Sequence, residues 1–178
     1  MTYISAYLTK GNLETIGRFT ATWAVFEQEL FSKKCGMRKI RSVISENEIS
    51  DMTLQSLVQQ LKNGLFSYTN GTNDCISALQ FRNSETDETA KEQTLKWLNG
   101  EMLCTYQLSI YIIFRIRCNM FHGEKMLWNL QQQEQLFKIC TDILEFYIYE
   151  KDNPNIYKPK LRKQYDGRII PYRGRFHG

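Results

Sequence analysis

The spacing of apolar residues constrains the fold of this chain more than any other feature of its sequence. Beginning at Asn12, apolar residues recur at steps of three and four, and they are Leu13, Ile16, Phe19, Trp23, Phe26 and Leu30. This spacing places apolar side chains on one face of an α-helix. We therefore expect a helix that begins near Asn12 and ends at Cys35-Gly36, where a glycine suits the residue after a helix.

Later segments of the chain have the same character. The expected helices cover residues 50–62, 74 to 79 or 81, 86–98, 101–121 and 129–150. Ser50 is expected to cap the first of these helices, and Asn63-Gly64 to end it. The apolar core at residues 110–114 would also suit a strand, but its long flanks without turn residues favour a helix.

The helical segments predict an all-α fold, an antiparallel bundle of about five helices with short connections. We expect residues 1–150 to form this domain and residues 151–178 to form an irregular basic tail, rich in tyrosine. The tail has eight Lys or Arg and two acidic residues, a net charge of +6, whereas residues 1–150 carry fifteen against seventeen, a net charge of −2. Positive charge is therefore concentrated in the tail.

Composition excludes several classes of protein. The longest apolar run, residues 108–114, is far shorter than the ~18 residues that span a bilayer, and residues 1–11 lack the pattern of a signal peptide. The five cysteines are odd in number and never in CxxC spacing, which argues against a disulfide framework and a zinc site. We expect a cytoplasmic protein with reduced thiols, without a metal or cofactor, and not bound to a membrane.

One short segment carries chemistry: Arg117-Cys118-Asn119-Met120-Phe121-His122-Gly123, at the end of the most apolar helix. A guanidinium is permanently charged and suits phosphate, and an imidazole exchanges a proton near neutral pH. Five residues of regular helix place Arg117 and His122 about 140° apart. Either the helix ends or bends near Asn119, or a second copy of the chain completes the site.

This segment resembles the R-x(4–6)-H motif of the HEPN superfamily, a group of small all-α domains that includes many prokaryotic ribonucleases. The opening helix, with Arg18-Phe-x(3)-Trp23-x-x-Phe26-Glu27, is similar to one branch of that family. Residues 12–150 share the family's order of elements. Two positions depart from its pattern, because Cys118 stands where a polar residue is usual and Glu124 stands where a branch with nucleotidyltransferase antitoxins has tyrosine.

The resemblance implies a metal-independent endoribonuclease that acts as a homodimer in prokaryotic defence or toxin–antitoxin biology, with a possible antitoxin or regulatory protein as partner. His122 would be the general acid or base, and Arg117 would stabilise charge on the phosphoryl oxygens. Asn119 and Glu27 would support the site or orient the phosphate.

Other interpretations remain open at this point. His122-Gly123 can be a helix end, Arg117 can pair with Glu27, and Cys118 can be a small buried filler. The basic tail suits an RNA backbone but also a solvated segment, and its candidate contacts are Lys160, Arg162, Lys163, Arg168, Arg173 and Arg175. The alternative function is a catalytically inactive helical module that binds RNA or a protein, or a structural subunit of an assembly.

Overall fold

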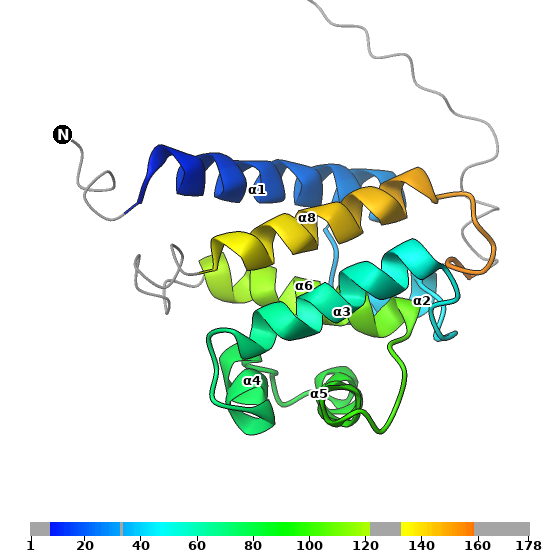
Figure 1. Cartoon of the computed structure of the whole chain (residues 1–178). Coiled ribbons are helices and arrows are strands. Elements are labelled where there is room, and N and C mark those ends of the chain that lie inside the picture. Colours follow the sequence, from blue (N-terminus) through cyan, green and yellow to red (C-terminus); the bar gives the residue numbers. More distant parts are fainter. Residues whose placement is uncertain (1–7, 33, 122–132, 159–178) are drawn as a thin grey trace, which may run out of the picture.

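The all-α class is confirmed. The computed structural model describes residues 8–32, 34–121 and 133–158, and over these residues the chain forms helices connected by loops (Figure 1). The helices are α1 (Lys10–Phe31), α2 (Met37–Val43), α3 (Met52–Phe66), α4 (Thr72–Leu79), α5 (Glu85–Asn99), α6 (Tyr106–Phe121) and α8 (Glu134–Tyr149). Within the described segments, no helix is long and apolar enough to cross a membrane.

Helices α1 and α8 lie side by side and run in the same direction (Figure 1). At their beginnings, Asn12 Nδ2 donates a hydrogen bond to Glu134 Oε2 over 2.6 Å. At their ends, Lys151 Nζ lies 3.1 Å from Glu29 Oε2. The expected antiparallel arrangement therefore does not hold for this pair. An antiparallel arrangement is expected for helices that are joined by a short loop, whereas most of the chain separates α1 from α8.

Helix α3 packs against α8 and continues through the glycine that was expected to end it. A Cβ atom at Gly64 would lie 3.2 Å from Leu136 Cδ1 and 3.7 Å from Ile139 Cδ1 of α8. The prediction of a helix end at Asn63-Gly64 was wrong because this glycine serves the close approach of two helices. The helix begins one residue later than expected, with Asp51 accepting from the backbone N–H of Leu54.

Residues 110–114 lie within helix α6, so the helical interpretation of this segment is correct. The helix is buried on nearly all sides. It begins at Tyr106 instead of residue 101, and Thr105 Oγ1 accepts a hydrogen bond from Leu108 N at its first turn. The hydroxyl groups of Ser109 and Tyr147 are 2.9 Å apart, and Tyr147 also donates to the Tyr106 carbonyl over 2.8 Å. The beginning of α6 thus meets the end of α8, and these two helices are antiparallel.

The connection from α1 to α3 contains a helix that the sequence pattern did not predict. Helix α1 ends at Phe31, and Ser32 adopts a left-handed φ of 58°. Gly36 is extended, with a φ of −163°, and precedes α2 as its N-cap. The expected role of Gly36 at the end of α1 was therefore wrong. Helix α2 has only 7 residues, too few to display a helical repeat.

The beginning of α5 differs from the expected residue 86. The helix begins at Glu85 with Ser84 as its N-cap, and the Ser84 Oγ accepts a hydrogen bond from Asp87 N. Helix α8 is described from Glu134, and residues 129–132 of the expected helix lie outside the described residues. Gly100, with a φ of 80°, ends α5, close to the expected end at residue 98.

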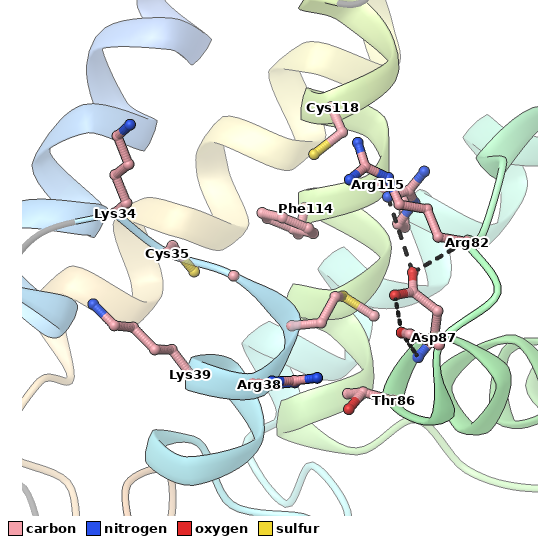
Figure 2. A pocket seen from close by; sticks show the side chains of 13 residues that line it. Lys34, Cys35, Arg38, Lys39, Arg82, Thr86, Asp87, Phe114, Arg115 and Cys118 are labelled. Carbon is pink, nitrogen blue, oxygen red and sulfur yellow. Dashed lines mark hydrogen bonds and ion pairs between the residues drawn. The ribbon is translucent and has the colours of Figure 1, made fainter.

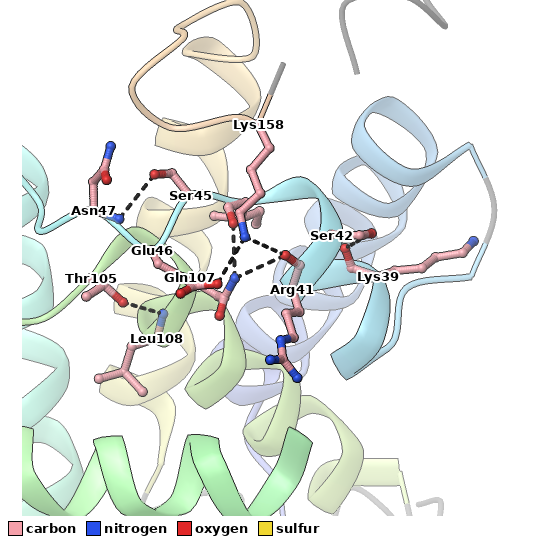
Figure 3. A network of polar contacts seen from close by, with 11 residues as sticks. Lys39, Arg41, Ser42, Ser45, Glu46, Asn47, Thr105, Gln107, Leu108 and Lys158 are labelled. Atoms are coloured by element: carbon pink, nitrogen blue, oxygen red, sulfur yellow. Dashed lines mark hydrogen bonds and ion pairs between the residues drawn. The ribbon is translucent and has the colours of Figure 1, made fainter. Parts of the chain in front are cut away.

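The first residues of the predicted tail pack against the body of the molecule. Ser45 N donates to the Ile156 carbonyl over 2.7 Å, and Lys158 N donates to the Val43 carbonyl over 2.8 Å. Tyr157 is buried and its hydroxyl donates to the Tyr147 carbonyl. Lys158 Nζ also contacts the Arg41 carbonyl (Figure 3). The chain therefore reaches residue 158 beside α2.

Candidate functional site

Arg117 lies in the last part of α6 and extends toward α1. Its Cζ atom is 5.8 Å from the centroid of the Trp23 ring. A guanidinium over an indole face is held by the charge distribution of the ring, and the attraction strengthens where water is excluded. Trp23 is buried and Arg117 is half-buried. The charge of Arg117 therefore has a fixed position at the α1–α6 contact.

Glu27 and Cys35 lie in the same neighbourhood. Glu27 follows Trp23 by one helical turn, so the two share a face of α1, and its Oε1 accepts a hydrogen bond from Cys35 N over 2.8 Å. Burial, followed by the negative charge of Glu27, raises the pKa of the Cys35 thiol far above its usual range, while the charge of Arg117 acts in the opposite direction. Glu27 therefore lies one helical turn after Trp23, the residue on which Arg117 packs. Cys35 itself is a neutral thiol at physiological pH.

Asn119 is directed elsewhere. It is 2% exposed, and its Nδ2 donates to the Ala78 carbonyl at the end of α4 over 2.8 Å. Two residues of helix separate it from Arg117 by about 200°, so the structure does not bring these two side chains together. Its buried Oδ1 has no hydrogen-bond partner within the described residues. As placed, Asn119 joins α6 to α4.

The remaining predicted site residues lie outside the described part of the chain. Helix α6 is described to Phe121, the residue immediately before His122. His122 is therefore not placed relative to Arg117. The tail residues proposed to contact RNA are also outside the described residues, and they are Lys160, Arg162, Lys163, Arg168, Arg173 and Arg175.

Sequence reasoning missed a basic pocket of about 400 Å³ that lies between α2, the beginning of α5, and α6 (Figure 2). Its charged lining residues are Lys34, Arg38, Lys39, Arg82, Asp87 and Arg115. A signal for it exists in the sequence, since residues 33–41 contain five cations and no acid. The cluster is not apparent from the net charge of residues 1–150, which is −2 because acidic residues elsewhere offset it.

One ion pair in the pocket wall is a structural element. Arg115 and Asp87 are 4% and 5% exposed, and Arg115 Nη1 lies 4.0 Å from Asp87 Oδ1. Arg115 also donates to the carbonyls of Leu79 and Gln80, which end α4. Burial lowers the pKa of Arg115 from its usual value. The only acidic residue that lines the pocket in the described structure therefore faces a buried arginine.

The cysteines and acidic residues suggest no metal site in the described structure. None of the five cysteines forms a disulfide within the described residues, and Cys118 is buried and lines the basic pocket. No group of three or more His, Cys, Asp or Glu side chains converges within the described residues.

Comparison with known proteins assigns the chain to no family. No protein-family model matches it, and no curated protein or solved structure is significantly similar to it. Its function must therefore be inferred from its own residues and their placement.

Proposed function

We propose that this protein is a metal-independent endoribonuclease of the HEPN type, cytoplasmic and acting as a homodimer. The observation that carries the proposal is the position of Arg117. It is a half-buried cation, packed on Trp23, located five residues before one of only two histidines in the chain. A permanently charged fork of N–H donors fixed in this way suits a phosphodiester.

In the proposed reaction the RNA supplies its own nucleophile. A histidine removes the proton of a ribose 2′-OH, the 2′ oxygen bonds to the adjacent phosphorus, and the bond from phosphorus to the 5′ oxygen breaks. The 5′ oxygen takes up a proton, so the products carry a 2′,3′-cyclic phosphate and a 5′-OH. His122 is the acid or base, and Arg117 stabilises charge on the phosphoryl oxygens. The proposal places the Arg–His pairs of two protomers in one cleft.

The role of Glu27 in this proposal is to support the site, because it lies one helical turn after Trp23, on which Arg117 packs. Asn119 can orient a phosphate only if its amide leaves the Ala78 carbonyl. We further propose that the helical bundle is the dimerising domain, that the protein acts in prokaryotic defence or toxin–antitoxin biology, and that an antitoxin or regulatory protein is its partner.

The second candidate function is a helical module that binds RNA or a protein without turnover. Two observations favour it. Asn119 is engaged in joining α6 to α4, and Cys118 is buried at the position where the resemblance predicts a polar residue. RNA binding without any cleavage product would select this function.

The test uses the purified full chain, a labelled structured RNA and EDTA in excess. We expect cleavage by the wild type, and a loss of at least about 10²-fold for Arg117→Ala and for His122→Ala, the scale of acid–base and charge-stabilising groups. His177→Ala is the matched control, because His177 also stands between a phenylalanine and a glycine. Arg18→Ala controls for loss of an arginine, since Arg18 pairs with Glu145 on the surface.

Size-exclusion chromatography with light scattering must show the same dimer for each variant. Cleavage that requires a divalent metal, or that survives both Arg117→Ala and His122→Ala, would contradict the proposed mechanism.

A further inference from the structure

The basic pocket holds more positive charge than the fold uses. Lys34, Arg38 and Lys39 have no carboxylate within ion-pair distance among the described residues, and all three are exposed. Arg82, in the loop before α5, also lines the pocket, and its backbone N–H donates to Asp87 Oδ1 over 3.3 Å. The acid in the lining, Asp87, is turned to Arg115 and the Ser84 hydroxyl. A concave surface with one sign of charge concentrates ions of the opposite sign.

The charge comes from side chains and not from a helix terminus. The first turn of α5 borders the pocket, but it carries Glu85, Asp87 and Glu88, which oppose the positive end of the helix dipole. In contrast, Arg38 extends from α2 across the pocket toward Thr86, and Phe114 lies between the α2 side and the α5 side (Figure 2). The volume of about 400 Å³ is within the range of ligand sites.

The pocket adjoins the Arg117 neighbourhood. Cys118, the residue after Arg117, lines the pocket, and so does Cys35, whose thiol is influenced by the charge of Arg117. The Phe114 ring also lies 6.0 Å from the Trp23 ring on which Arg117 packs. The pocket and Arg117 are therefore neighbours along the last part of α6.

We propose that this pocket binds backbone phosphates of the RNA strand, next to the phosphodiester at Arg117. The inference rests on the proposed function for its choice of ligand. Arg38 and Lys39 of α2 make the phosphate contacts, with Lys34 and Arg82 at the rim. A strand held in this way would be anchored in each protomer by charges that take no part in bond cleavage.

The test measures binding of a fluorescent single-stranded RNA to the full chain by anisotropy, in EDTA and over a series of salt concentrations. We expect Arg38→Gln/Lys39→Gln to weaken binding about tenfold at 100 mM salt. Its log–log salt slope should fall by about 1.4, since each lost phosphate contact removes about 0.7. The control is Lys10→Gln/Lys91→Gln, which removes two exposed lysines outside the pocket and should leave the slope nearly unchanged.

An equal loss in the control would contradict the inference, because binding would then follow net charge alone. Absence of RNA binding by the wild type would contradict it as well, as would micromolar binding of inorganic pyrophosphate in place of RNA. The readouts separate this inference from the proposed function. Wild-type binding that depends on Arg38 and Lys39 without cleavage supports the pocket and contradicts the nuclease. Cleavage by the wild type, together with unaltered RNA binding by Arg38→Gln/Lys39→Gln, would support the nuclease and contradict the pocket.

Discussion

At the scale of single residues, two arginines two positions apart on α6 have different roles. Arg115 is buried, donates to the carbonyl groups that end α4 and faces Asp87. Arg117 is half-buried and packs on Trp23. Helical geometry turns their side chains about 200° apart. One arginine therefore stabilises the fold, and the other remains a candidate for substrate contact.

The structural role of Arg115 gives a prediction about stability. Arg115→Ala leaves the carbonyls of Leu79 and Gln80 without their donor and Asp87 without its counter-charge. We expect the free energy of unfolding to fall by about 3 kcal/mol, as for other buried pairs that lose one member. Urea denaturation followed by circular dichroism measures it. Arg18→Ala, which removes a surface pair, should cost less than about 1 kcal/mol, and equal losses for the two variants would contradict the assigned roles.

At the scale of helices, glycines in α1 and α3 have opposite environments. A Cβ atom added at Gly17 meets nothing within 4 Å, whereas one added at Gly64 approaches Leu136 of α8. Both residues lie inside helices, where glycine costs about 1 kcal/mol relative to alanine. A larger residue at position 17 can therefore stabilise α1, whereas position 64 requires a residue without a side chain because α8 lies close to it.

These environments predict opposite effects of substitution. Gly17→Ala should raise the free energy of unfolding by about 0.5–1 kcal/mol through helix propensity. Gly64→Val should lower it by about 1–3 kcal/mol because the added carbons press on α8. Thermal and urea unfolding of both variants provide the measurement, and each serves as the control for the other. A shift of the same sign in both would contradict the packing at Gly64.

The long helices were predictable from sequence because each repeats its apolar face over several turns. The expected segments correspond to α1, α3, α5, α6 and α8. At most of the ends that the structure describes, the expected and observed bounds differ by only a few residues. The short α2 offers too little pattern, and the parallel pairing of α1 with α8 depends on contacts between distant segments. The contact of Gly64 with α8 could not be predicted either, because Asn63-Gly64 has the sequence pattern of a helix end.

The candidate site was predictable only in part. The resemblance singled out Arg117, which packs on Trp23, and Glu27, which lies one helical turn after Trp23. It did not predict that Asn119 points toward α4. The basic pocket combines residues from three segments, 34–39, 82–87 and 114–118, so no single motif contains it. Only the local charge of residues 33–41 pointed toward it.

At the scale of the whole molecule, buried thiol and phenol groups keep their protons in the folded chain. Burial raises the pKa of the Cys104 thiol and of the Tyr147 and Tyr157 phenols above their usual ranges. In the unfolded chain these groups lose their protons from about pH 8.5 for thiols and about pH 10 for phenols. The folded chain keeps those protons, so it binds more of them and its stability falls as pH rises.

We therefore expect the urea midpoint to decrease between pH 8 and pH 10.5. Each buried group lowers the free energy of unfolding by up to about 1.4 kcal/mol per pH unit once its unfolded form has ionised. Cys104→Ala removes one such group and should make the decline shallower. A midpoint that is constant over this pH range, or an unchanged slope in Cys104→Ala, would contradict the assignment.

We propose that the protein cleaves RNA by attack of a 2′-OH on the adjacent phosphorus. The most direct measurement compares an RNA with the same RNA carrying a 2′-O-methyl group at its mapped cleavage site, both in EDTA. We expect 2′,3′-cyclic phosphate and 5′-OH ends from the first RNA and no cleavage at that site in the second. Cleavage of the methylated RNA, or products with 5′-phosphate ends, would contradict it.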